Sequence, residues 1–257
     1  MVSYVEKENR NQIAPLFQEW NETLIWSCLQ GCMGAAFADN LEHPVSAQII
    51  IADFCFFAGE VNCELISHKP KDLEQDFIIM VPQNEAWARE IELIYGEKAK
   101  EVTRYAIRKE QDIFNIVYLT GIVENLDTEY ELKLIDEKLF RMVMSERWSR
   151  DLCSQFADYE DYAKRGVGVA ALHAGKIAAG ASSYTVYQQG IEIEIDTKEE
   201  YRRKGLALSC GARLILECLK RKLYPSWDAQ NPASVALAEK LGYHFDYEYK
   251  AYEIMDY

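Results

Sequence analysis

The sequence is short of positive charge and of histidine. It has 28 lysine and arginine residues against 42 aspartate and glutamate residues, a formal net charge of −14, and 4 histidines. Nucleic-acid binding depends on basic clusters that neutralise phosphates, so this balance disfavours a nucleic-acid partner. It is compatible with a cationic substrate such as an amine. None of the histidines lies near a plausible nucleophile in the sequence, and we interpret all of them as structural or surface residues.

Long apolar runs are also missing. A membrane-spanning helix needs roughly 18 or more consecutive apolar residues. The longest apolar run here, residues 47–61, is interrupted by Asp53. The polar N-terminal segment MVSYVEKENRNQ does not have the pattern of a signal peptide. We therefore expect a cytoplasmic protein with no membrane partner.

The cysteines form no recognisable set of metal ligands. There are 7, an odd and scattered number, and most lie inside apolar runs. Cys28 and Cys32 are close in sequence, but no second pair or nearby histidine completes a site. We expect buried structural thiols, a reducing compartment and no metal.

What the chain does contain is a stretch typical of anion binding. Residues 191–212 read IEIEIDTKEEYRRKGLALSCGA: an alternating strand, a charged loop and an apolar helix. Unpaired N–H groups and the helix dipole attract an anion at such a helix start. Gly205 permits close approach of a ligand, and Arg202, Arg203 and Lys204 supply cationic side chains. A solvated basic turn is the alternative interpretation.

Two common phosphate motifs do not fit. In Lys204-Gly205 the order is wrong for a nucleotide-triphosphatase loop, and no hydroxyl residue follows. Residues 166–171, GVGVAA, imitate a dinucleotide-binding pattern. However, they follow a polar run and lead into a predicted hairpin strand, which is the wrong context.

Two other motifs resemble those of the GNAT superfamily of N-acetyltransferases. Arg202-x-x-Gly205-x-Ala207 is similar to its acetyl-CoA loop, and residues 231–243, NPASVALAEKLGY, are similar to a second segment of that family. The predicted order of elements after residue 129 also matches the family. In overall layout the chain loosely resembles a two-part group of antibiotic-resistance acetyltransferases, the zwittermicin-resistance-like proteins.

The resemblance implies a specific way of holding acetyl-CoA. The strand that includes Ile193, Ile195 and Thr197 would pair its free backbone with the pantetheine arm, because the family leaves that strand edge open. The loop would hold the pyrophosphate, and two residues of the second motif would lie near the arm. The implied cofactor-binding residues are Ile195, Thr197, Arg202, Arg203, Lys204, Gly205, Leu206, Ala207, Asn231 and Ser234.

The expected fold is α+β in α/β/α layers. We expect a GNAT domain over residues 125–257, with a mixed and largely antiparallel sheet. A divergent α+β domain over residues 1–124 is expected to be a degenerate GNAT-like repeat or a substrate domain. The predicted helices cover residues 9–30, 85–95, 205–222 and 232–241, and a helical region with a break covers 136–156. The predicted strands cover 46–60, 77–81, 102–108, 130–135, 167–172, 177–188, 191–196 and 226–229, with a connection at 111–128 and a closing hairpin at 243–254.

Alternation places Glu192, Glu194 and Asp196 on one face of the first strand of the anion-binding stretch. An amine must lose a proton before it attacks a thioester, so we expect Glu192 or Glu194 to act as general base. The alternative is three acids on a solvated face. A backbone N–H of Ile195 or Thr197 would polarise the thioester oxygen.

One departure from the family concerns the proton donor. Where the family often has a tyrosine that protonates the departing thiolate, this chain has Ala238. Tyr243, Ser234 or a water would then take that role, or the thiolate leaves without help.

The sequence therefore predicts direct transfer of an acetyl group from acetyl-CoA to a primary amine of a small molecule. The alternatives are a non-catalytic CoA- or metabolite-binding regulator and transfer of a larger acyl group. A homodimer is compatible with the sequence.

Overall fold

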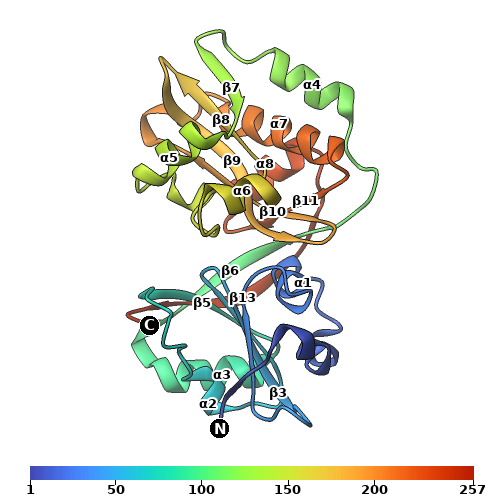
Figure 1. Cartoon of the computed structure of the whole chain (residues 1–257), viewed down its shortest axis with the longest axis vertical. Helices are drawn as coiled ribbons and strands as arrows, with labels where there is room; N and C mark the ends of the chain where they lie inside the picture. The colour runs from blue at the N-terminus through green and yellow to red at the C-terminus, as the bar shows by residue number, and fades with distance from the viewer. The chain divides into compact units, whose positions relative to one another are not determined.

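The computed structural model describes residues 1–257 and divides them into two compact units. Unit 1 comprises Met1–Arg104 with Glu248–Tyr257, and unit 2 comprises Tyr105–Tyr247 (Figure 1). Both are mixed α+β structures, which confirms the predicted fold class. No helix is long and apolar enough to cross a membrane, and all of the cysteines are free thiols.

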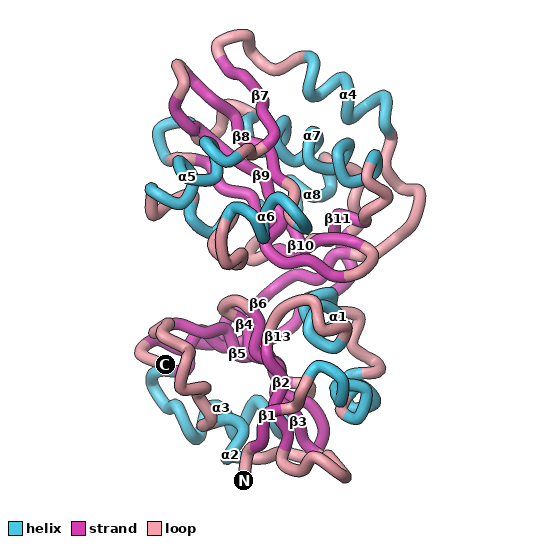
Figure 2. The backbone as a smooth tube through the Cα atoms, in the orientation of Figure 1, coloured by secondary structure: helices cyan, strands magenta, loops and turns pink.

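Unit 1 is built on strands that are hydrogen-bonded in the order β1-β2-β3-β4-β5-β13-β6, and β6 and β13 continue into unit 2 at residues 105–107 and 245–247, where β6 also pairs with β12 (Asp228–Ala229). Neighbours from β1 to β4 are antiparallel, β4 and β5 are parallel, and β13 runs antiparallel to β5. Figure 2 draws these strands in magenta. The strands are β1 Ser3–Tyr4, β2 Ala35–Ala38, β3 Ser46–Ile51, β4 Phe54–Gly59, β5 Phe77–Pro82, β6 Ala99–Ile107 and β13 Phe245–Met255. The helices are α1 Thr23–Leu29, α2 Cys63–Ile66 and α3 Glu85–Tyr95, with 3₁₀ turns at Lys7–Gln12, Ala14–Phe17 and Gly96–Lys98.

The core of unit 1 lies between this sheet and α3. Trp87 of α3 is fully buried, stacks on Phe57 with 5.3 Å between ring centroids, and donates its indole N–H to the Gly59 carbonyl. Helix α3 has the predicted bounds because the Asn84 side chain accepts hydrogen bonds from the first-turn N–H groups of Ala86 and Trp87.

Two predictions in unit 1 were wrong. The single helix predicted over residues 9–30 is two 3₁₀ turns followed by α1. Pro15 lacks an N–H donor, and the Glu22 carboxylate starts a separate helix by accepting from Leu24 N. The single strand predicted over residues 46–60 is the hairpin β3–β4, which turns at Ala52 in the left-handed region (φ 54°).

Unit 2 contains a five-stranded sheet in the order β11-β10-β9-β8-β7. All neighbouring pairs are antiparallel except β10 and β11, which are parallel. The strands are β7 Tyr130–Leu134, β8 Gly168–His173, β9 Lys176–Tyr187, β10 Gly190–Thr197, β11 Tyr224–Ser226 and β12 Asp228–Ala229, the last pairing with Tyr105 and Ala106 of β6. The helices are α4 Ile116–Glu124, α5 Glu137–Ser145, α6 Tyr159–Arg165, α7 Leu206–Lys220 and α8 Pro232–Lys240, with 3₁₀ turns at Arg150–Leu152 and Glu199–Tyr201.

Helices cover both faces of this sheet, as the predicted layers require. A Cβ on Gly211 of α7 would lie 3.2 Å from Ile195 Cδ1 of β10, so α7 covers the isoleucine face. On the other face, the Tyr162 hydroxyl of α6 lies 3.0 Å from Ser182 Oγ of β9. Figure 1 shows α5 and α6 on the opposite side of β8–β10 from α7.

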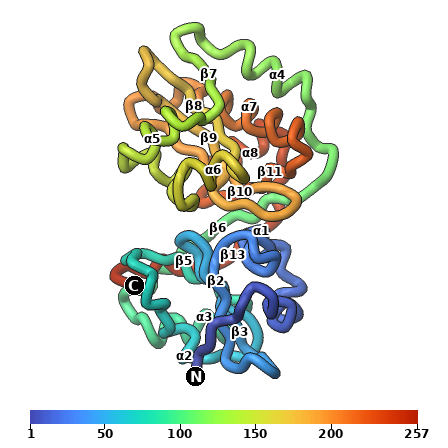
Figure 3. The backbone as a smooth tube through the Cα atoms, in the orientation of Figure 1, coloured from blue at the N-terminus to red at the C-terminus, as the bar shows by residue number.

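Two further segments differ from the sequence prediction. The predicted connection at 111–128 contains α4, which packs on α7 (Figure 3) and is capped by the Asn115 side chain. The predicted closing hairpin at 243–254 is the single strand β13, because residues 244–255 contain no glycine, proline or asparagine for a tight turn.

The boundaries of the compact units differ from the predicted domain boundary after residue 124. Residues 105–124 belong to unit 2 and residues 248–257 to unit 1. As a boundary between parts of different function, the division after residue 124 stays a prediction, and so does the half-repeat.

Gly190, at the start of β10, tests how tightly β10 and β11 are joined. A Cβ there would lie 2.0 Å from the Tyr224 carbonyl oxygen and 2.6 Å from the Tyr187 hydroxyl. We expect Gly190→Ala to lower the free energy of unfolding by about 1–3 kcal/mol in denaturant titrations, because the backbone of β11 must move.

The matched control is Gly121→Ala in α4. No atom lies within 4 Å of a Cβ at that position, so the better helix former should stabilise by up to about 1 kcal/mol. Equal effects of the two substitutions would contradict the expected clash.

Candidate functional site

Strand β10 is paired along one edge and only at its start along the other. Its partner β9 accompanies it from Gly190 to Thr197. Strand β11 pairs only at Gly190↔Tyr224, Ile191↔Pro225 and Glu192↔Ser226, after which the chain leaves and forms β12 with β6. The edge of β10 over residues 193–197 is therefore open to an extended ligand.

Alternation shows which backbone groups point to this open edge. The N–H of Lys198 donates to Ala178 on the β9 side, so the N–H groups of Ile195 and Thr197 point the other way. Thr197 already donates its N–H to Asp196 Oδ1 at 2.6 Å, and its carbonyl accepts from Arg202 Nε at 3.3 Å. Of the two predicted positions, Ile195 thus presents the backbone better suited to a ligand.

A loop and a helix start follow directly after this edge. Gly205, the residue before α7, has φ 81°, and no side chain caps the helix. Arg203 also lies in the left-handed region, with φ 62°. A cavity of about 490 Å³ opens here, lined by Thr197, Tyr201, Arg202, Arg203, Gly205, Leu206, Ala207, Leu208, Leu237 and Lys240. Unpaired N–H groups, the positive end of the helix dipole and two guanidinium groups suit the diphosphate of CoA.

Most of the predicted loop residues line this cavity, but Lys204 does not. Its ammonium donates to the Tyr130 hydroxyl at 3.3 Å and lies 5.2 Å from the centre of the Tyr201 ring. The hydrogen bond to Tyr130 raises the pKa of Lys204. His173 bonds to the Tyr201 hydroxyl and lies 3.3 Å from the carboxylate of Glu129. Lys204 therefore belongs to an aromatic cluster beside the cavity.

The second motif has structural contacts of its own. Asn231 caps α8 by accepting from Ser234 N at 2.9 Å, and Ser234 Oγ accepts from the Trp227 indole at 3.1 Å. Neither Asn231 nor Ser234 lines the cavity, whereas Leu237 and Lys240 of the same helix do. Leu237 and Lys240 are three positions apart in the motif and so lie on one face of the helix. This spacing is the signal that would have identified them.

The three carboxylates of β10 lie in different surroundings. Glu192 is 4% exposed and is the last residue that pairs with β11. Glu194 is half-buried and lies opposite Ser182 of β9. Burial raises the pKa of Asp196 and the carboxylate of Asp151 adds to this, while the Thr197 N–H and Arg202 oppose it. The pairing with β9 shifts between Glu192 and Ile193, where β9 carries one extra residue.

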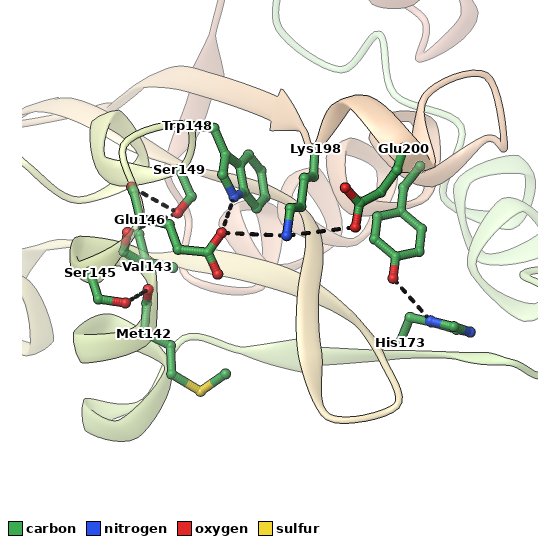
Figure 4. A network of polar contacts seen from close by, with 10 residues as sticks. Met142, Val143, Ser145, Glu146, Trp148, Ser149, His173, Lys198 and Glu200 are labelled. Carbon is green, nitrogen blue, oxygen red and sulfur yellow. Dashed lines mark hydrogen bonds and ion pairs between the residues drawn. The ribbon is translucent and has the colours of Figure 1, made fainter.

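Lys198, at the end of β10, connects the loop to the segment after α5. Its ammonium lies 3.6 Å from carboxylate oxygens of both Glu146 and Glu200 (Figure 4). Glu146 also accepts from the Trp148 indole at 2.6 Å. This network fixes the entry to the anion-binding loop against the α6 side of the sheet.

The groups expected to replace the missing tyrosine as proton donor differ in whether they are free to donate a proton. Ala238 is fully buried. The Tyr243 hydroxyl donates to the Pro225 carbonyl at 2.6 Å, and burial raises the pKa of Tyr243 well above its ordinary value. The Ser234 hydroxyl accepts from Trp227 and still has its own proton to donate.

Comparison with known proteins identifies relatives of one kind. A family model described as GNAT acetyltransferase matches residues 14–252, which include parts of both units. The crystal structure of a GCN5-related N-acetyltransferase-like protein from Streptococcus suis 89/1591 is 44% identical. It covers 96% of this chain and 98% of its own, with a TM-score of 0.90.

Two proteins of lower sequence identity are also similar to this chain. The uncharacterized N-acetyltransferase YdfB of Bacillus subtilis strain 168 is 29% identical over an alignment of 180 residues, which covers 62% of this chain and 69% of that protein. A GCN5-related N-acetyltransferase from Sphaerobacter thermophilus shares the fold at 9% identity and a TM-score of 0.58. It covers 99% of this chain and 95% of its own.

Asp196 provides a test of the electrostatics of this site. A carboxyl whose pKa is raised on folding destabilises the folded protein once it ionises, so stability is lost as the pH rises above about 3.8 and through the folded pKa. Asp196→Asn keeps an oxygen for the Thr197 N–H. We expect it to raise the Tm at pH 7 and to have a progressively smaller effect as the pH is lowered.

Differential scanning fluorimetry across pH 4–8 measures this difference. Asp127→Asn, an exposed residue outside the sheet, serves as control. A Tm gain for Asp196→Asn that does not depend on pH would rule out the assigned cause.

Proposed function

Because the chain belongs to the GNAT acetyltransferase family, and is therefore an acyltransferase, we propose that it transfers an acetyl group from acetyl-CoA directly to a primary amine of a small molecule. The observation that carries this proposal is the open edge of β10, which leads directly to the cavity at the start of α7. An extended molecule can lie along the open edge of β10, and an anionic group at its end can lie in the cavity.

The binding mode follows from the site. The backbone of Ile193 and Ile195 pairs with the amides of the pantetheine arm, as a strand would. The diphosphate lies at the start of α7, where Arg202 and Arg203 add charge-assisted hydrogen bonds. The thioester then lies toward Glu192, where β10 and β11 separate.

The chemistry requires a proton acceptor, because an ammonium group has no lone pair with which to attack. We assign Glu192 as this base and keep Glu194 as the alternative. Glu192 is buried at the end of the open edge, close to the expected position of the thioester. Glu192 first receives a proton from the ammonium group. The neutral amine nitrogen then attacks the thioester carbon, the C–S bond breaks, and the second proton lost by the nitrogen passes to the departing CoA thiolate. A backbone N–H at the open edge of β10 that is not paired with the arm stabilises the charge that develops on the thioester oxygen.

The carboxylate assignment is tested with two matched substitutions. Calorimetry first establishes acetyl-CoA binding, and a thiol-release assay over a panel of amines then finds an acceptor. We expect Glu192→Gln to lower kcat/KM by about 10²–10⁴-fold with little change in acetyl-CoA affinity, and Glu194→Gln to lower it much less.

Each other outcome has a definite meaning. No binding of acetyl-CoA would refute the proposed function. Binding without turnover on any amine would support a CoA-binding regulator, for which the buried Ala238 is the favouring observation. Turnover with a larger acyl-CoA in preference to acetyl-CoA would support the third possibility. A larger effect of Glu194→Gln would move the base to that residue.

The diphosphate site is tested with a shortened ligand. Arg203, in the loop before α7, lines the cavity and is exposed, whereas Arg213 of α7 is exposed and lies outside the cavity. We expect Arg203→Ala to weaken acetyl-CoA binding by about 10-fold, with no effect on acetyl-pantetheine, which lacks the diphosphate. Arg213→Ala is the control and should change neither Kd. Equal weakening of both ligands by Arg203→Ala would place the arginine elsewhere.

A further inference from the structure

Three polar side chains form a row across the sheet of unit 2. Glu192 of β10 lies directly opposite Thr185 of β9 and directly beside Ser226 of β11. Residues that pair directly across neighbouring strands project from the same face, with Cβ atoms about 4.5–5.5 Å apart. Thr185, Glu192 and Ser226 therefore share the face that is opposite α7.

The two hydroxyls of this row are buried and have no partner in the protein. Thr185 and Ser226 are both 0% exposed, and neither Thr185 Oγ1 nor Ser226 Oγ makes a hydrogen bond to a protein group. A buried hydroxyl without a partner is costly, so such groups normally bind an ordered water or a ligand. An internal water typically makes about three hydrogen bonds, and this row offers two hydroxyls and one carboxylate.

The row also has a particular place in the fold. Glu192 and Ser226 are the last paired residues before β10 leaves β11, and the pairing with β9 shifts immediately after Thr185 and Glu192. The row thus closes the end of the open edge, at the point where the proposed binding mode brings the thioester and the amine.

We propose that Thr185 and Ser226 are positioning residues that hold an internal water against the Glu192 carboxylate, and that this water relays the proton from the amine. This inference rests on the proposed function of Glu192 as base. The ammonium form of the substrate gives a proton to the water, the water gives one of its own to Glu192, and the neutral amine and a carboxylic acid remain.

Hydroxyl groups suit this role in both states of the carboxyl group. A serine or threonine hydroxyl donates one hydrogen bond and also accepts. Before the transfer the hydroxyls and the water stabilise the ionised carboxylate. After it, one hydroxyl rotates so that the water can donate in a different direction. A valine or alanine at either position allows neither arrangement.

The titratable neighbours of this row are tyrosines. Burial raises the pKa of Tyr224 to about 12, with smaller contributions from the carboxylates of Glu110 and Glu192. Burial likewise raises the pKa of Tyr243, and Glu192 contributes there as well. Both tyrosines stay neutral between pH 5 and 9, so neither contributes to the acidic limb of a pH–rate profile over that range.

The test is the pH dependence of kcat/KM for Thr185→Val and Ser226→Ala. Loss of a hydrogen bond to the charged form raises the pKa of the base. We expect each substitution to move the acidic limb to higher pH, lowering kcat/KM there by about 10-fold and far less on the alkaline plateau. Thr185→Ser, which keeps the hydroxyl, should restore the limb of the parent enzyme.

Ser183→Ala is the matched control, because Ser183 is a buried serine of the same strand outside the row, whose hydroxyl accepts from Val167 N. A merely structural role would lower activity equally at all pH values for all of these variants, and that result would overturn the proposal. Unchanged limbs in folded Thr185→Val and Ser226→Ala would overturn it as well.

The failure of the proposed function looks different. If Glu192→Gln retains full activity and the acidic limb, Glu192 is not the base, and both its assignment and the relay fall while acetyl transfer stands. If Glu192→Gln abolishes the activity while the two hydroxyl variants keep the parent profile, only the relay fails. A crystal structure at high resolution adds a readout independent of turnover: a water bonded to Thr185, Glu192 and Ser226 supports the relay, and its absence refutes it.

Discussion

The site depends on one feature of the hydrogen-bonding pattern: β10 and β11 pair over three residues and then separate. A parallel pair that continued would satisfy the backbone of Ile195 within the sheet and leave nothing for a ligand. Because β12 instead pairs with β6, the edge of β10 stays open over residues 193–197 while its other edge is fixed by β9. The remaining elements place chemistry at the two ends of this edge.

The two ends have opposite electrostatic character. At Thr197 the edge meets the start of α7, where Gly205 and two arginines provide for a negative group in a chain whose net charge is −14. At Glu192 the edge ends in a buried carboxylate that suits a positive group. Helix α7 lies on the isoleucine face, so the carboxylate face is left to the side of α6. A single strand thereby separates the anionic part of one substrate from the cationic part of the other.

Much of unit 2 could be predicted from the sequence because its signals are local. The starts of α5 and α8, the break between β8 and β9 and the alternation of residues 191–196 each depend on a few neighbouring residues and appear where expected. What failed depended on distant partners. The hairpin β3–β4 could not be recognised, because both strands are buried in the sheet and together form one continuous apolar run in the sequence. The contact between the Lys204 ammonium and the Tyr130 hydroxyl could not be predicted either, because the two residues are far apart in sequence. The shift in pairing after Glu192 leaves no trace in the sequence of β10, because the extra residue belongs to β9.

The path of the chain has a consequence for its synthesis. Strand β13 pairs through residues 252–255 with residues 77–80 of β5, so the sheet of unit 1 incorporates a segment that leaves the ribosome after all of unit 2. Domains generally fold as units during translation. Most of unit 1 is synthesised first, but its sheet lacks β13 until the end of translation. Unit 2 is therefore the first unit that can finish folding. Contacts of such long sequence separation form late and slowly. A nascent chain arrested before residue 248 would therefore expose the edge of β5 to chaperones and to other chains.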